Sequence, residues 1–365
     1  MGKSNCWTGR WWVAIVLASA AFGTVTANGT EKTPRLEISI PIEVQNDWTY
    51  DSDDSGNKHN QLFTSIEPEA TLHLIPGLTL VGHAVIEPVR DPEAGENRYI
   101  EDEGIFVEDL FVDYAIGRHG LRGGKFTPAF GVAWDITPGI YGTDFAEAGY
   151  EFAERIGIAG CAGFEVGSAG AYTLTAHGFF RDTTILSELW GRGRGTTERG
   201  DGGVSNTGDF SSYALTLDGE DIAGFKGLGA RLSFIRQAKG VDNAEDEKGV
   251  SVALWHKLKL GGELTLSPMM EYVHFDDAEG EDDQDRDFLT AAGRLGWRSW
   301  NLTLAYTGRD TEPAGAAEID DYQFQVSAGY SFGFGIDLDV GWQIVEEGDI
   351  ESQRLGLLLA YTANF

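Results

Sequence analysis

We expect no catalytic residues in this sequence. The groups whose arrangement indicates a function are its charged side chains. The sequence contains no His-Glu-x-x-His zinc motif and no glycine-rich phosphate loop. Acidic residues gather instead in short polar stretches, and residues 276–287 hold eight acids and one arginine. Such clusters attract cations, and divalent cations could bridge them to an anionic lipid surface. The sequence therefore indicates electrostatic steering of ions and implies no cofactor.

Strands must position these charges, because apolar and polar residues alternate along most of the chain. In residues 300–307 apolar side chains occupy the even positions and mostly polar ones the odd positions. The same period of two continues through residues 355–365 and ends on Phe365. We count about sixteen such segments, each close to the roughly ten residues that a tilted strand needs to cross a bilayer.

The connections between these segments alternate in length. Long polar stretches such as 91–104 and 276–286 alternate with short turns such as GRHG at 117–120. A membrane barrel has tight turns at one rim and long loops at the other. A soluble β-sandwich would need two large stacked sheets, and a propeller would show a blade-length repeat. The pattern favours an all-β fold: a transmembrane antiparallel up-and-down β-barrel of about sixteen strands, with long outer loops and short periplasmic turns.

Composition and the N-terminal segment fit an exported barrel. Hydrophobic residues make up 42% of the 365 residues, which excludes a disordered polyanion despite the net charge of −31. The acidic balance also disfavours nucleic acid as a partner. Residues 1–27 have the basic residues, short apolar core and small-residue cleavage site of a signal peptide. We therefore expect residues 28–365 to form a single barrel domain in the outer membrane of a bacterial cell.

Two stretches resemble the outer-membrane porins of Gram-negative bacteria. One is the alternating terminal strand that ends in Phe365, and the other is GGKFTPAFG at 123–131. The resemblance implies a homotrimer whose terminal strand, with Tyr361 and Phe365, is recognised by the barrel-assembly machinery. It also implies that the third long loop, residues 128–149, folds into the lumen and narrows it.

This third loop carries the sharpest functional prediction. The resemblance implies that Asp135, Asp144 and Glu147 form the acidic side of a constriction, where carboxylates attract cations. The opposite wall should be basic, because strand parity places several basic residues on the lumen side. The predicted basic residues are Arg155, Arg231, Arg294 and Arg354, together with Arg122 and Lys125, whose parity is ambiguous. An acidic loop that faces a basic wall predicts a transverse field and a modest preference for cations.

The predicted function is a water-filled channel for passive diffusion of small hydrophilic solutes and ions. Two alternatives remain open on the same barrel. One is a substrate-selective porin for phosphate, other anions or sugars, and the other is an adhesin or receptor barrel. In either case the acidic outer loops could contact lipopolysaccharide through divalent cations.

Overall fold

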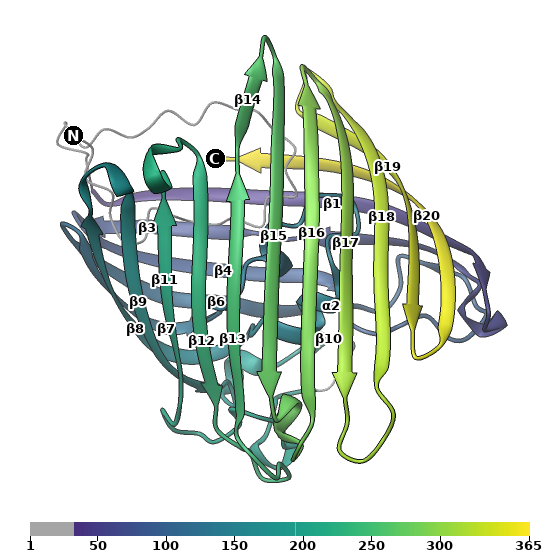
Figure 1. Ribbon diagram of the computed structural model, residues 1–365, viewed down its shortest axis with the longest axis horizontal. Coiled ribbons are helices and arrows are strands. Elements are labelled where there is room, and N and C mark those ends of the chain that lie inside the picture. Colours follow the sequence, from purple (N-terminus) through teal and green to yellow (C-terminus); the bar gives the residue numbers. More distant parts are fainter. Residues whose placement is uncertain (1–32, 194) are drawn as a thin grey trace.

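The structure, a computed structural model, describes residues 33–193 and 195–365, and these form one closed antiparallel barrel of sixteen wall strands (Figure 1). The predicted all-β up-and-down barrel is therefore confirmed. The predicted signal peptide at residues 1–27 lies outside the described residues. None of the described helices is long and apolar enough to cross a membrane.

The wall strands follow one another around the barrel in chain order, and two of them are interrupted. They are β1 (Arg35–Ser52), β2 (Asn60–Ile66) continued by β3 (Glu69–Ile75), β4 (Leu78–Pro88), β6 (Glu103–Ile116), β7 (His119–Phe126), β8 (Arg155–Glu165), β9 (Ala171–Arg181), β11 (Ser212–Glu220), β12 (Leu228–Gln237), β13 (Glu247–His256) continued by β14 (Leu258–Gly261), β15 (Leu264–Asp276), β16 (Asp285–Trp297), β17 (Trp300–Glu312), β18 (Ile319–Ser331), β19 (Ile336–Glu347) and β20 (Ile350–Asn364).

The connections confirm the predicted long-short alternation. Tight turns join β3 to β4 and β16 to β17 at one rim, which we call the short-turn rim. Longer loops occupy most of the other rim, which we call the long-loop rim, although β19 and β20 are joined there by a tight turn at 348–349, and two of the loops contain short strands that pair with the wall. These are β5 (Arg98–Tyr99), parallel to β2, and β10 (Trp190–Gly191), antiparallel to β6. Gly77 in a short turn has φ of +84°, and a Cβ there would lie 2.5 Å from the Ala115 carbonyl oxygen.

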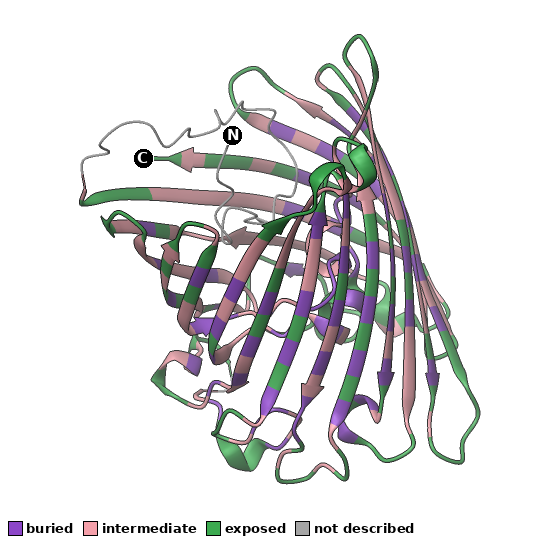
Figure 2. Ribbon diagram, turned by 60° about the vertical axis from the view of Figure 1, so that its left-hand side comes forward, coloured by how far each residue is buried: buried purple, intermediate pink, exposed green. Residues whose placement is uncertain are grey.

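The alternating pattern sorts side chains between the two faces of the wall, visible as bands of burial in Figure 2. On β17, Trp300, Leu302 and Leu304 point outward and are exposed, whereas Asn301 and Thr303 point inward and are buried. An apolar outer band with a polar inner face is the arrangement of a barrel that sits in lipid and holds water.

The barrel closes between its first and last strands. β1 pairs with β20 from Ser39↔Asn364 to Ser52↔Ser352, with one irregularity near Thr49. The Phe365 amide donates to the Ile38 carbonyl at 3.0 Å, and the Ile38 amide donates back at 3.3 Å. The last residue therefore completes the ladder, as a lipid-exposed edge requires.

The alternating pattern also predicts single strands over 61–75 and over 150–165, and both boundaries were wrong. The segment 61–75 is not one strand, because Pro68 lacks an amide hydrogen and β2 and β3 end on either side of Glu67 and Pro68. The strand predicted over 150–165 begins only at Arg155, because helix α2 (Asp144–Tyr150) extends into that stretch.

Candidate functional site

The loop between β7 and β8 lies inside the barrel, where α2 is visible behind the front wall in Figure 1. It contains the four-residue helix α1 (Ala133–Ile136) and then α2. The buried Glu271 of β15 holds the first helix in place. Its Oε1 and Oε2 accept hydrogen bonds from the amides of Val132 at 2.9 Å and Ala133 at 2.5 Å. A carboxylate in the wall thus satisfies the free amides at the start of α1.

An apolar cluster fills the space between this loop and one side of the wall. Phe130, Tyr150 and Phe152 of the loop pack against inward side chains of β9 and of β11 to β16. The Phe130 ring lies 5.4 Å from that of Phe275, and the Tyr150 ring lies 5.1 Å from that of Phe288. These contacts remove that half of the lumen from the water-filled path.

Polar contacts fix the start of α2 against a third part of the wall. Thr143 caps the helix by accepting from the Ala146 amide, and Thr307 of β17 donates to the Thr143 hydroxyl at 2.9 Å. Arg354 of β20 forms an ion pair with Asp144 at 2.5 Å. The position of α2 is therefore set by contacts at its first turn.

The free face of α2 is acidic. Asp144, Glu147 and Glu151 are spaced by three and four residues, which places them on one side of the helix. With Ala148 they line a cavity of about 490 Å³. Asp144 and Glu147 are exposed to it.

Carboxylates of the wall lie close enough to influence this face. Desolvation inside the barrel raises the pKa of Glu147 to about 7, and the charges of Asp144, Glu108 and Glu67 raise it further. The pKa of Glu151 lies well above its ordinary value through burial and then through the charge of Glu108. Acids thus face α2 from β6 and from the interruption between β2 and β3.

His83 of β4 lies between these two wall acids. Its Nδ1 lies 3.0 Å from the Glu108 carboxylate, and its Nε2 lies 3.8 Å from that of Glu67. Neither acid was predicted from the sequence. Glu67 lies in the strand interruption, and Glu108 lies at a register shift between β4 and β6, so the alternating pattern fails at both positions.

The structure brings Asp144, Glu147 and Arg354 together but places Asp135 elsewhere. Asp135 belongs to α1 and is half-buried. Burial raises its pKa to about 7, and Arg231 opposes this shift. Asp135 therefore lies beside the packed half of the wall and does not line the cavity beneath α2.

Other predicted basic residues make local contacts that support the barrel. Arg231 pairs with Asp218 at 2.7 Å and donates to the Gly131 carbonyl at 2.8 Å, so it holds the loop. Lys125 is fully buried and pairs with Glu154 at 3.0 Å and Asp182 at 3.1 Å.

Three further basic residues also have acceptors nearby. Arg122 pairs with Asp113 at 2.7 Å. Arg155 donates to the Ala153 carbonyl at 2.6 Å. Arg294 lies within electrostatic range of Asp337 and Asp339.

The two residues predicted to signal assembly lie on the outer face of β20 and just beyond it. Tyr361 pairs in register with Ile42 of β1 and Ile336 of β19, and its side chain is exposed. The Phe365 side chain is 77% exposed. Both side chains are therefore exposed on the folded barrel.

One group of described residues has the composition of a cation site. Ligand atoms of His274, Asp276 and Asp285 lie within 4.8 Å of one another at the long-loop rim. The His274 ring nitrogens lie 2.9 Å from Asp287 and 3.3 Å from Asp276. The group belongs to the acidic stretch for which divalent bridging to lipid was predicted.

The chain contains one match to the Gly-x-Ser-x-Gly nucleophile spacing, residues 329–333. A nucleophile elbow needs a strand followed by a helix. Here Ser331 ends β18, and a tight turn leads directly into β19. The spacing therefore lacks the local structure that would activate a serine.

The fold is shared with known outer-membrane proteins. No known family model matches the sequence, and no curated protein matches it. OmpF of Salmonella typhi, solved in complex with daunomycin, is 13% identical with a TM-score of 0.62, and the match covers 90% of this chain and 98% of OmpF. The outer membrane channel DcaP of Acinetobacter baumannii is 12% identical with a TM-score of 0.56, covering 90% and 97%. OmpT of Vibrio cholerae in its trimer form is 11% identical with a TM-score of 0.55, covering 91% and 100%. The chain is therefore a porin-like β-barrel.

Proposed function

We propose that this protein is an outer-membrane channel through which small hydrophilic solutes and ions diffuse passively, with a preference for cations. The porin-like fold, the apolar outer band and the polar inner face support a water-filled pore. In this proposal the third loop narrows the pore and presents its acidic face to the open side.

The proposed preference for cations rests on the observation that acidic side chains lie on both sides of the path. Asp144, Glu147 and Glu151 line the cavity beneath α2, and the charge of Glu108 acts on this face from the wall. Negative charges in a narrow pore with low-dielectric walls focus a potential that concentrates cations. Arg354, by contrast, is paired with Asp144. We therefore propose a stronger preference for cations than the predicted acid-against-base constriction would give.

Reversal potentials across a KCl gradient in planar bilayers test this proposal. At about pH 8.5, where the Glu147 carboxylate is charged, the wild-type channel should be cation-selective, and Glu147→Gln should lower the permeability ratio several-fold. Neutralising four acids within 276–287 is the matched control and should change the ratio little, because salt screens exposed charges within about 10 Å at 0.1 M. Anion selectivity in the wild type would overturn the proposal and favour an anion-specific channel.

The assembly that we propose is a homotrimer in the bacterial outer membrane, inserted by the barrel-assembly machinery after removal of residues 1–27. The trimer form of the structurally similar OmpT supports this stoichiometry. Native mass spectrometry of the purified protein should give three chains, and a monomer under all mild detergents would contradict the trimer.

A further inference from the structure

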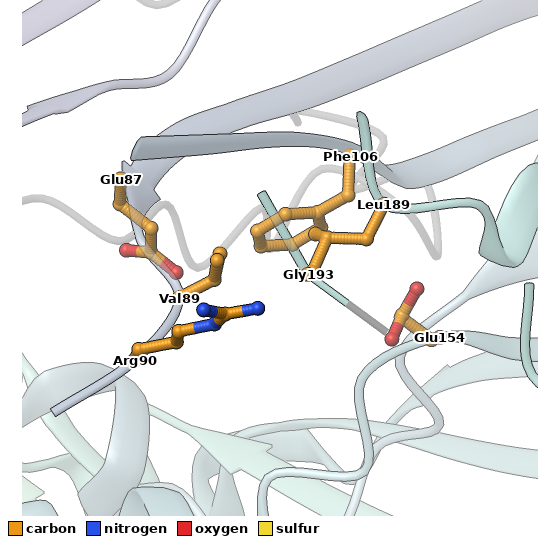
Figure 3. A pocket seen from close by; sticks show the side chains of 7 residues that line it. All are labelled: Glu87, Val89, Arg90, Phe106, Glu154, Leu189 and Gly193. Atoms are coloured by element: carbon orange, nitrogen blue, oxygen red, sulfur yellow. The ribbon is translucent and has the colours of Figure 1, made fainter. Parts of the chain in front are cut away.

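A second cavity, of about 470 Å³, lies between the loops at the long-loop rim. Its lining combines apolar and charged side chains from β4, β6 and three loops. The lining residues are Glu87, Val89, Arg90, Phe106, Glu154, Leu189 and Gly193. Figure 3 shows the Phe106 ring and Leu189 between the carboxylates of Glu87 and Glu154, with the Arg90 guanidinium beside Val89. Small-molecule sites have this composition, with apolar walls and a few polar groups.

Two opposite charges of this cavity have no partner within residues 33–193 and 195–365. The Arg90 guanidinium forms no ion pair or hydrogen bond there, and neither does the Glu87 carboxylate. Although Arg90 and Glu87 line the same cavity, they do not form an ion pair with each other. A guanidinium recognises a planar carboxylate through two parallel hydrogen bonds, and a carboxylate accepts from an ammonium group.

Hydrogen bonds and an ion pair hold the segments around this cavity in place. Arg98 donates to the Arg90 carbonyl and, at 2.8 Å, to Gln61 Oε1, which fixes the backbone that carries Arg90. On the other side, buried Lys125 pairs with Glu154 and donates to the Leu186 carbonyl at 2.8 Å. The cavity therefore has a fixed shape on both sides.

Close packing between loops brings the apolar wall together. β10 pairs with β6 through Trp190↔Ile105 and Gly191↔Gly104, which places Leu189 near Phe106. A Cβ on Gly104 would lie 2.6 Å from the Val89 side chain, so a glycine is required at this contact. Val89, Phe106 and Leu189 thus form the apolar part of the cavity lining.

We propose that this cavity binds a zwitterionic amino acid with an aromatic or large apolar side chain. Arg90 pairs with the carboxylate of the solute, Glu87 pairs with its ammonium group, and the apolar wall packs against its side chain. The charge of Glu87 also acts on Glu151 of α2, so the cavity adjoins the acidic path. The inference deepens the proposed channel function, since solute held here is delivered to the constriction.

Calorimetric titration of the purified barrel in detergent, with L-phenylalanine as the probe, tests this inference. L-phenylalanine should bind with millimolar or better affinity, and glycine, which lacks the apolar group, should bind about tenfold or more weakly. Two further probes each lack one charge: 3-phenylpropionate has no ammonium group, and 2-phenylethylamine has no carboxylate.

The variants should separate the two charges. Arg90→Gln should weaken binding of L-phenylalanine and 3-phenylpropionate about tenfold and leave 2-phenylethylamine unchanged. Glu87→Gln should weaken L-phenylalanine and 2-phenylethylamine and leave 3-phenylpropionate unchanged. Arg298→Gln, at the short-turn rim, is the matched control and should change nothing.

The outcomes distinguish this inference from the channel proposal. Absence of L-phenylalanine binding to a barrel that conducts ions overturns the inference and leaves the channel intact. Equal losses for all probes in both variants would also overturn it, because the two charges would then have no separate roles. Binding without conductance would support the cavity and contradict the channel.

Discussion

The two halves of the lumen wall differ in what their inward side chains do. From β9 to β16 these side chains include an apolar cluster that packs against the third loop through residues such as Phe275 and Phe288. From β1 to β6 they include the acids Glu87 and Glu108, whose charges act on α2. The apolar cluster thus lies on the side of the wall where the third loop packs, and acids whose charges act on α2 lie on the other side.

Disrupting the terminal strand β20 should have the largest effect on the protein, because this strand joins the two halves of the barrel wall. Phe365→Asp should remove most folded barrel from the outer membrane, because it replaces the exposed aromatic side chain of the predicted assembly signal with a charge, although the main-chain hydrogen bonds to Ile38 remain possible. The heat-modifiable band of isolated outer membranes measures this. Phe334→Asp, at an equally exposed phenylalanine in a short turn, should assemble normally. Normal amounts of the Phe365→Asp barrel would contradict the role of the last residue.

Releasing the third loop from the half of the wall against which it packs should have the next largest effect. Glu271→Ala leaves the amides of Val132 and Ala133 and the hydroxyls of Ser251 and Tyr150 without their acceptor. Hydrogen bonds to a charged group contribute about 1.5–3 kcal/mol each. We expect single-channel conductance to rise about twofold or more and to become noisy.

The conservative variant sharpens this result. Glu271→Gln keeps the shape of the side chain and one acceptor oxygen, so its conductance should lie between those of the wild type and Glu271→Ala. If the folded Glu271→Ala channel conducts like the wild type, then the apolar cluster alone holds the loop.

The sequence predicted the wall better than it predicted the lumen. Strands such as β17 follow from a two-residue period that lipid on one side and water on the other impose. Helix α2 has only seven residues, too few for a helical period to stand out, and contacts such as Thr307 with Thr143 position it. Those contacts join residues 164 positions apart, which local pattern cannot reveal.

Strand parity also failed where strands were irregular. It predicted lumen-facing arginines such as Arg231, but parity carries no information about the partner that neutralises each one, here Asp218. It missed Glu67 and Glu108 because an interruption and a register shift interrupt the alternation there. The acidic half of the path therefore emerged only from the folded chain.

Lowering the pH should reduce the negative charge of the acids on the open side of the lumen. It should leave the packing of the third loop against the other side unchanged. The pKa of Glu147 is raised to about 7, so its carboxylate is charged above that pH and gains a proton as the pH falls through it. The cation permeability ratio should therefore fall between about pH 8.5 and about pH 5.5. Glu147→Gln should reduce this pH dependence. A ratio that is constant over this range would show that Glu147 does not control the path.

Replacing Arg354, which neutralises one acid at the start of α2, should have the smallest effect on the cation permeability ratio. Arg354→Gln removes the ion pair with Asp144, and the freed carboxylate adds one negative charge to the path. The Asp144 side chain is 52% exposed, so the pair contributes little to stability and the variant should fold normally. We expect the cation permeability ratio to rise, by less than about twofold, because water and salt screen this charge more than that of Glu147. Arg298→Gln, whose partner Glu263 lies at the short-turn rim, is the matched control and should leave the ratio unchanged. A fall in the ratio after Arg354→Gln would mean that α2 moves when it loses this contact, so that the first turn, more than the apolar cluster, fixes the acidic face toward the open half.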